Sequence, residues 1–126
     1  MKKTLFLLVV GLMLLLLSAC GSPKEADFPT GKFIKSGETD YGLMFDSDNT
    51  FSVFQGETTY VTGTYKVDGD VFTETSNDGG CETNVSFHYK FDGSKLTFSY
   101  VGDPEKDASC TGRYADFNNM AYTLSK

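Results

Sequence analysis

The amino-acid sequence predicts an all-β domain, a small antiparallel meander of about eight short strands that closes into a barrel. Short runs in which apolar and polar residues alternate indicate strands with one buried face. The turn-forming stretches "SDN", "DGD", "NDGG" and "DGS" separate these runs. Eleven Phe and seven Tyr, with no Trp, supply rings for one apolar interior, and closing the sheet removes its edges.

The N-terminal segment, residues 1–19, has the pattern of an export signal. Met1, Lys2 and Lys3 form a charged start, residues 5–17 are apolar, and Ser18-Ala19 provides a small-residue cleavage step. Thirteen helical residues would extend roughly 20 Å, whereas the hydrocarbon core of a bilayer is roughly 30 Å thick. We therefore expect this segment to be removed on export.

The stretch Leu17-Ser18-Ala19-Cys20 closely resembles the bacterial lipobox. The resemblance implies that the Cys20 thiol receives a diacylglyceryl group, that cleavage falls before it, and that Cys20 begins the mature chain. Two acyl chains hold a protein stably on a bilayer, where one chain holds it only marginally. The expected location is therefore the extracytoplasmic face of the cell membrane. The alternative is an ordinary secretory signal whose cysteine is accidental.

The mature chain divides into a tether and one domain. Residues 20–27 combine Cys20 with a short polar tether, and residues 28–126 are long enough for one modest core. Removal of Lys2 and Lys3 leaves nine basic against seventeen acidic residues, a net charge of −8. This balance disfavours nucleic acid and anionic bilayer surfaces as partners.

The clearest strands are the runs 85–91 and 96–100, which the turn signal Asp92-Gly93-Ser94 joins into a hairpin. One face of this hairpin carries the candidate ligand-lining residues Phe87, Tyr89, Phe91, Leu96, Phe98 and Tyr100. The other expected strands are Gly31–Lys35, Tyr41–Phe45, Thr50–Gln55, Tyr60–Val67, Val71–Thr75 and Tyr122–Leu124. No stretch has a convincing helical period, and only the loop 103–114 is long enough for a single helical turn.

Two similar stretches lie twenty-four residues apart. "YKVDGDVFT" begins at Tyr65 and "YKFDGSKLTF" begins at Tyr89. We interpret them as two successive hairpins, because the shared residues are those that a hairpin turn selects. An internal duplication is the alternative.

The two remaining cysteines, Cys81 and Cys110, predict a disulfide, because thiols of an exported domain oxidise. The bond would close a loop of about thirty residues and stabilise the fold by roughly 3 to 4 kcal/mol in the chain-entropy model. Metal binding is the alternative, but two sulfurs without a partnering histidine make a poor site. We therefore expect no metal.

Several short motifs together resemble the small bacterial lipocalin-like, or calycin-type, lipoprotein domains over residues 28–126. They are "GKF", "FDSDNTFSV", "GTYKVDGDVFT", "CETNVSFHYKFDGSKLTFSYVGD" and "CTGRY". The chain departs from that pattern in having Phe33 in place of Trp and Asp48-Asn49 in place of Asp-Gly. The resemblance implies that Arg113 covers the Phe33 ring by a cation–π contact and closes one barrel end. A solvated surface arginine is the alternative.

Other residues that could carry chemistry have simpler interpretations. Asp46, Asp48, Thr50 and Glu57 match four positions of a calcium loop, but Phe51 stands where that loop requires Gly, so a tight turn is expected. His88 has no orienting partner nearby in sequence, which indicates a surface residue. Paired carboxylates flank Gly or Pro in turns. We therefore expect neither catalytic residues nor a cofactor.

Two classes of function fit these expectations. In the first, the lipid-anchored barrel binds a small apolar molecule without catalysis, with Phe, Tyr and Met side chains lining its interior. In the second, the barrel is solid and serves as a structural or protein-interaction module of the cell envelope. The interior volume distinguishes them, because a cavity under about 100 Å³ is too small for such a ligand. Exposed Tyr41, Tyr60 or Tyr114 clustered on one surface would favour the second.

Overall fold

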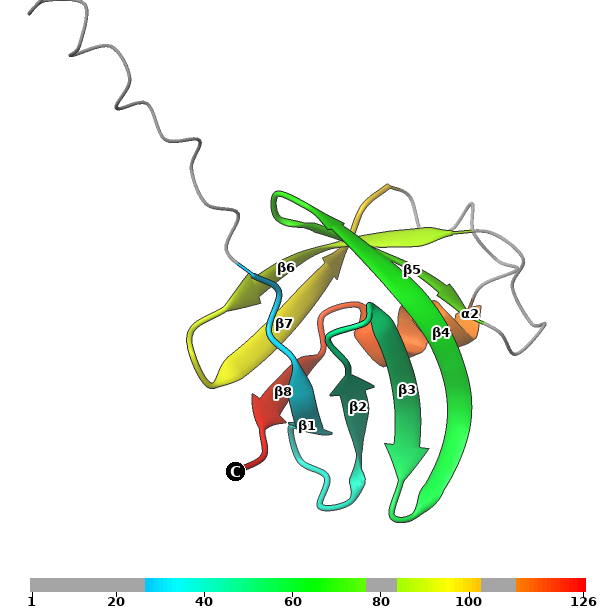
Figure 1. Ribbon diagram of the computed structural model, residues 1–126, viewed down its shortest axis with the longest axis vertical. Coiled ribbons are helices and arrows are strands. Elements are labelled where there is room, and N and C mark those ends of the chain that lie inside the picture. Colours follow the sequence, from blue (N-terminus) through cyan, green and yellow to red (C-terminus); the bar gives the residue numbers. More distant parts are fainter. Residues whose placement is uncertain (1–26, 77–83, 103–110) are drawn as a thin grey trace, which may run out of the picture.

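The computed structural model describes residues 27–76, 84–102 and 111–126 (Figure 1). It contains eight strands and one helix in those ranges. They are β1 (Gly31–Lys35), β2 (Tyr41–Phe45), β3 (Thr50–Gln55), β4 (Thr58–Asp68), β5 (Val71–Ser76), β6 (Val85–Phe91), β7 (Lys95–Tyr100), α2 (Thr111–Phe117) and β8 (Ala121–Leu124). Each expected strand is present: β1, β2, β3 and β6 have the expected bounds, and β4, β5, β7 and β8 are longer by one or two residues at an end.

The sheet is a closed barrel in which every strand pairs antiparallel with its sequence neighbours. Closure comes from β1, which pairs with β2 on one side, Phe33 opposite Leu43, and with β8 on the other, Phe33 opposite Leu124. The predicted all-β barrel of about eight strands is therefore confirmed. Because consecutive strands are neighbours, short turns make nearly all the connections.

Hairpin turns form where the sequence places Asp, Asn and Gly. Gly69 and Gly93 have φ values of 60° and 99°, in the left-handed region that favours glycine. The Asp92 carboxylate accepts backbone hydrogen bonds from Ser94 and Lys95 at 2.9 and 2.7 Å. These bonds hold the pKa of Asp92 below its ordinary value. Both stretches that share the Tyr-Lys-apolar-Asp-Gly pattern are hairpins, as predicted.

The helix is longer than expected. α2 runs to Phe117, whereas the sequence indicated a single helical turn at most, within the loop 103–114. Seven residues are too few to show a helical period, and the helix is stabilised by burying Phe117 in the core. In Figure 1, α2 crosses one open end of the barrel.

We define two ends of the barrel by the turns that lie there. The helix end carries α2, the β1–β2 turn and the β3–β4 turn, which approach one another through a Gly56 to Asp40 backbone hydrogen bond of 2.9 Å. The mouth carries Phe28, the β2–β3 turn at Asn49 and the β4–β5 turn at Gly69. In Figure 1 the chain that precedes β1 enters at the mouth.

Candidate functional site

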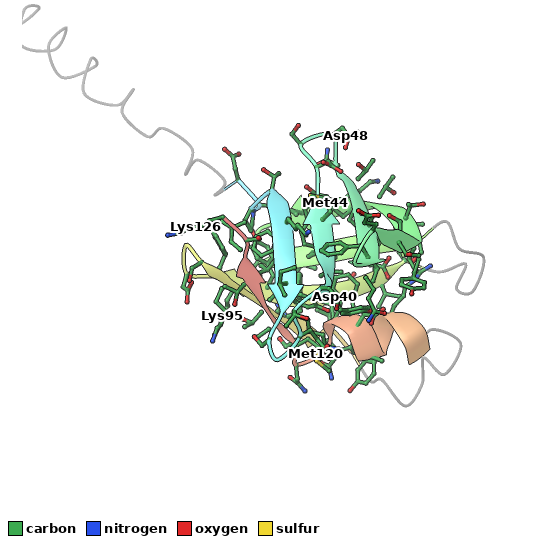
Figure 2. All side chains as sticks on the ribbon, turned by 90° about the horizontal axis from the view of Figure 1, so that it is seen from below. Asp40, Met44, Asp48, Lys95, Met120 and Lys126 are labelled. Atoms are coloured by element: carbon green, nitrogen blue, oxygen red, sulfur yellow. The ribbon has the colours of Figure 1, made fainter. Side chains whose placement is uncertain are left out.

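The interior of the barrel is filled by aromatic side chains (Figure 2). Phe72 lies at the centre of this packing. Its ring centroid lies 5.1 to 6.5 Å from those of Phe28, Phe45, Phe51, Tyr65, Phe98 and Phe117. Distances in this range correspond to direct ring contact. The space that a ligand would need is therefore occupied by the protein's own side chains.

The six candidate ligand-lining residues all face inward, as their alternation predicted. Three of them, Phe87, Leu96 and Phe98, are fully or almost fully buried in the core. Phe87 and Phe98 both contact Phe117 of α2, with ring centroids 5.1 Å apart in each case. Half-buried side chains complete the set, namely Tyr89, Phe91 and Tyr100. These residues are brought together, but as packing partners of one another.

The helix end holds a buried ion pair. Arg113 of α2 places its Nε 3.2 Å from Oε1 of Glu74 on β5. The two side chains are 7% and 0% exposed. Ser76 also donates a hydrogen bond to the other oxygen of Glu74 at 3.2 Å. This pair could not be predicted from the sequence, because nothing in the residues around Glu74 indicates that Arg113 is its partner.

The predicted contact between Arg113 and Phe33 stays a prediction. Phe33 is fully buried and makes edge contacts of 6.0 Å with Phe45 and Phe91. Among the described residues, the cation–π contacts join Lys32 to Phe54 at 4.8 Å and Lys35 to Tyr41 at 5.3 Å. Arg113 does lie at a barrel end, as the resemblance implied, but there it faces Glu74. The alternative of a solvated surface arginine is wrong, because the side chain is buried.

A second polar group at the helix end joins α2 to β2 and β8. Tyr41 donates a hydrogen bond of 2.5 Å to the Asp116 carboxylate, and Tyr122 donates one to the Asp116 carbonyl. Burial raises the pKa of Asp116 above its ordinary value, although the Tyr41 hydrogen bond lowers it in part. Burial, followed by the nearby carboxylate, raises the pKa values of Tyr41 and Tyr122. The protonated phenols therefore hold α2 across the barrel end.

At the mouth, Phe28 inserts its ring among four others. Its centroid lies 4.9 Å from Tyr89, 5.0 Å from Phe45, and 5.1 Å from both Tyr65 and Phe72. These partners come from β6, β2, β4 and β5, so one residue outside the sheet joins four strands. We call the four rings around Phe28 the mouth socket. Phe28 itself is half-buried, and Asp27 beside it is exposed.

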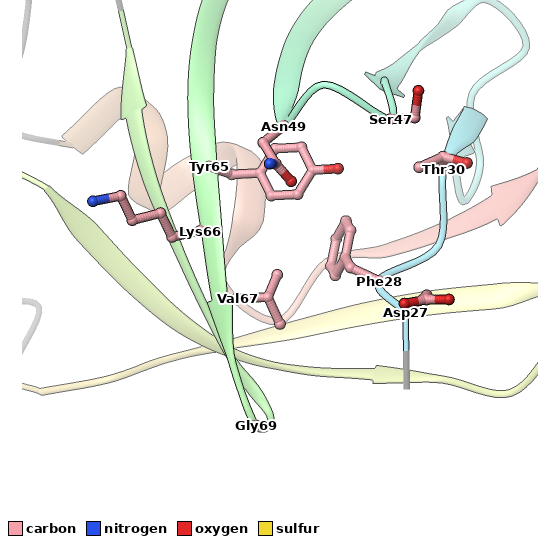
Figure 3. A pocket seen from close by; sticks show the side chains of 9 residues that line it. All are labelled: Asp27, Phe28, Thr30, Ser47, Asn49, Tyr65, Lys66, Val67 and Gly69. Carbon is pink, nitrogen blue, oxygen red and sulfur yellow. The ribbon is translucent and has the colours of Figure 1, made fainter. Parts of the chain in front are cut away.

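A cavity of about 920 Å³ lies beside the mouth socket and opens to solvent (Figure 3). Phe28 and Tyr65, which are in ring contact, make the apolar side of the cavity together with Val67. Ser47 and Asn49 contribute polar atoms from the β2–β3 turn. This cavity therefore lies at the mouth of the barrel.

His88 has a partner that its sequence position did not reveal. Its Nδ1 lies 2.9 Å from the Asp70 carboxylate, because β5 and β6 pair Val71 opposite His88. On the next strand Ser99 stands opposite His88. The pair is solvent-exposed, at 50% for His88 and 73% for Asp70, so water competes for both groups. His88 is a surface residue, as predicted, and its partner is eighteen residues away in the sequence.

The stretch "DSDNT" is a tight turn, as predicted. Asp48 accepts hydrogen bonds from the backbone and hydroxyl of Thr50, at 3.1 and 2.6 Å, and these lower its pKa. Asn49 takes a φ of 64°, which Asn tolerates better than most residues. Within the described residues, no cluster of three or more His, Cys, Asp or Glu is arranged to hold a metal ion.

Several predicted features lie outside the described residues. They are the signal 1–19, Cys20 with the tether to residue 26, and both cysteines of the predicted disulfide, Cys81 and Cys110. In the described part of the chain, the structure has no helix with the length and apolarity that crossing a membrane requires.

Comparisons of the chain with protein-family models, with curated proteins and with solved structures gave no match.

Proposed function

We propose that this chain is a membrane-anchored bacterial lipoprotein whose extracytoplasmic barrel is a solid-core module that docks a partner in the cell envelope and performs no catalysis. The filled interior supports this most directly. Rings from all eight strands, α2 and the N-terminal segment occupy the space that a lipocalin-like carrier would keep for its ligand. A barrel of this kind offers its outer surface and its ends for recognition.

The most exposed aromatic residue of the described chain is Tyr60 on β4, at 59%. Tyr41 and Tyr114 also lie toward the helix end, but Tyr41 is bonded to Asp116, and Tyr114 packs on Tyr100 at 5.3 Å. Tyrosine is favoured at interfaces because its ring adds apolar contact and its hydroxyl stays hydrogen-bonded. Tyr60 is therefore the position from which docking is best tested.

A photo-reactive residue at position 60 should give a discrete crosslinked product in intact cells. The matched control is position 95 on β7, also exposed and three strands away around the barrel. A product from position 60 alone supports docking through that face. If position 60 and two other exposed sites of β3 and β4 give no product, docking through this side of the barrel is refuted.

A second candidate function is binding of a small apolar molecule at the mouth, and the cavity beside Phe28 favours it. The domain should then bind a fluorescent fatty acid saturably. Val67→Asp should weaken that binding at least tenfold, because it puts a charge on the apolar side of the cavity. Thr62→Asp, on the outer face of the same strand, should leave it unchanged. Absence of saturable binding to the unsubstituted domain would exclude this candidate for fatty acids.

Mass spectrometry tests both the proposed lipid anchor and the predicted disulfide. Intact-protein mass spectrometry of membrane-extracted protein should find residues 1–19 removed and a diacylglyceryl group on Cys20. Cys20→Ser should abolish both changes.

Without a reductant, Cys81 and Cys110 should resist alkylation, and after reduction each should take one alkyl group. Free thiols in the native protein would contradict the bond.

A further inference from the structure

The mouth socket fixes the place where the barrel is attached to its membrane anchor. The tether ends at Asp27, and the next residue, Phe28, is packed among rings of four strands. Phe28 is therefore part of the folded domain, and the chain leaves the domain at the mouth. We propose that Phe28 holds the mouth toward the bilayer, so that the helix end with α2 faces away from the membrane. This rests on the proposed lipidation of Cys20.

The lengths of the tether and the barrel make this orientation effective. Eight Cα steps separate Cys20 from Phe28, which sets a maximum reach of about 28 Å. β4 runs from the helix end to the mouth, and its eleven residues extend about 36 Å along the strand. A tether shorter than the strand keeps the mouth the nearer end.

The orientation gives the two ends different partners. The mouth cavity, with Phe28 and Val67 on its apolar side, opens toward the lipid. The helix end, where Tyr41 bonds to Asp116, and the β3–β4 turn point into the space beyond the membrane. A protein partner would therefore meet the helix end first, and an apolar molecule leaving the bilayer would meet the mouth first.

Charge at the mouth sets how closely it approaches the lipid. The β2–β3 and β4–β5 turns there carry exposed carboxylates, Asp46, Asp48, Asp68 and Asp70. An anionic bilayer repels these groups over about one Debye length, roughly 8 Å at physiological salt. The mouth should therefore approach a neutral bilayer more closely than an anionic one.

The test measures the distances of the two ends of β3 from the lipid. Lipidated protein is placed in phosphatidylcholine vesicles that contain a head-group quencher, with a fluorophore on Ser47→Cys at the mouth or on Glu57→Cys at the helix end. Both sites are exposed turns, and label bound by the unsubstituted chain is the blank. Quenching at position 47 should exceed that at position 57 at least twofold, and adding anionic lipid should reduce it.

Two further variants test the role of Phe28. Phe28→Ala should lower the quenching ratio but leave it above one, because the tether then lengthens by three residues, up to Gly31, which β1 holds at the mouth. Asp27→Ala, an exposed neighbour, should leave the ratio unchanged. Equal quenching at both positions in vesicle-bound protein with Phe28 intact would overturn the orientation alone. Failure of the protein to float with vesicles would instead refute the lipid anchor on which the orientation rests.

Discussion

Arg113 and Glu74 form an ion pair between α2 and β5 in which the Nε–Oε1 distance is 3.2 Å and both side chains are buried. The pair joins a helix to a strand nearly forty residues earlier in the chain. Burial of two charges costs free energy that their attraction and hydrogen bonds must offset. The pair therefore fixes the position of α2 on the barrel, and it is weaker evidence for a gain in the free energy of unfolding.

Removing one member of the pair should be more harmful than removing both. Arg113→Met takes the positive charge away from a fully buried carboxylate, and we expect it to lower the free energy of unfolding by about 3 to 5 kcal/mol. Glu74→Leu with Arg113→Met should recover part of that loss. Urea unfolding of the two single variants and the double variant measures the coupling. A double variant whose loss equals the sum of the single losses would show that the two charges do not interact.

Phe72 should be the most sensitive position of the aromatic core. Phe72→Ala removes a ring that contacts six others, and large-to-small changes of this kind cost about 3 to 5 kcal/mol. The variant should also bind benzene, whereas the unsubstituted domain should not, because its interior is filled. Thermal denaturation with and without benzene checks both statements. Tyr60→Ala, at an exposed ring, should change the free energy of unfolding by less than about 0.5 kcal/mol.

Gly42 should tolerate no larger side chain. A Cβ at this position would overlap the carbonyl oxygen of Phe33 on β1 and lie 3.0 Å from the Phe54 ring. Gly42→Ala should therefore lower the free energy of unfolding by roughly 2 kcal/mol or more, because the barrel seam near β1 must shift. Gly112→Ala is the matched control, since nothing lies within 4 Å of a Cβ there. Equal stability of the two variants would contradict the close approach of β1 and β2.

Because of Tyr122, the free energy of unfolding should fall at alkaline pH. Burial raises the pKa of Tyr122 above its ordinary value near 10, so the folded state keeps a proton that the unfolded state loses. Its contribution is fully present below about pH 10 and is lost as pH rises further. Urea midpoints measured from pH 7 to 11 should therefore fall less steeply for Tyr122→Phe than for the unsubstituted domain.

The control for that titration is Tyr60→Phe, whose ring is exposed. At neutral pH it should change the free energy of unfolding by less than about 0.5 kcal/mol. At neutral pH, Tyr122→Phe should be less stable by about 1 kcal/mol, because it loses the hydrogen bond to the Asp116 carbonyl. Identical alkaline slopes for Tyr122→Phe and the unsubstituted domain would mean that another group dominates the loss.

The register of strands could be predicted only in part from the sequence. Alternation placed Phe87 and Phe98 inside correctly, because side-chain direction depends only on position along one strand. The bulge between Val53 and Phe54 could not be foreseen. At the bulge the consecutive residues Val53 and Phe54 are both buried. The Lys32 ammonium lies 4.8 Å from the centroid of the Phe54 ring, and this ring packs against Gly42, which has no side chain. Such a contact depends on three strands at once, and no single run of sequence contains it.

The sequence by itself determined the class of fold, the strands and the turns, because alternation and turn residues act over a few neighbouring positions. Only the tertiary structure decided that the interior is full, that Phe28 closes the mouth, that Glu74 receives Arg113 and that His88 faces Asp70. The last three join residues at least seventeen positions apart. Such pairs meet only when the barrel closes, since closure rather than local preference brings their strands together.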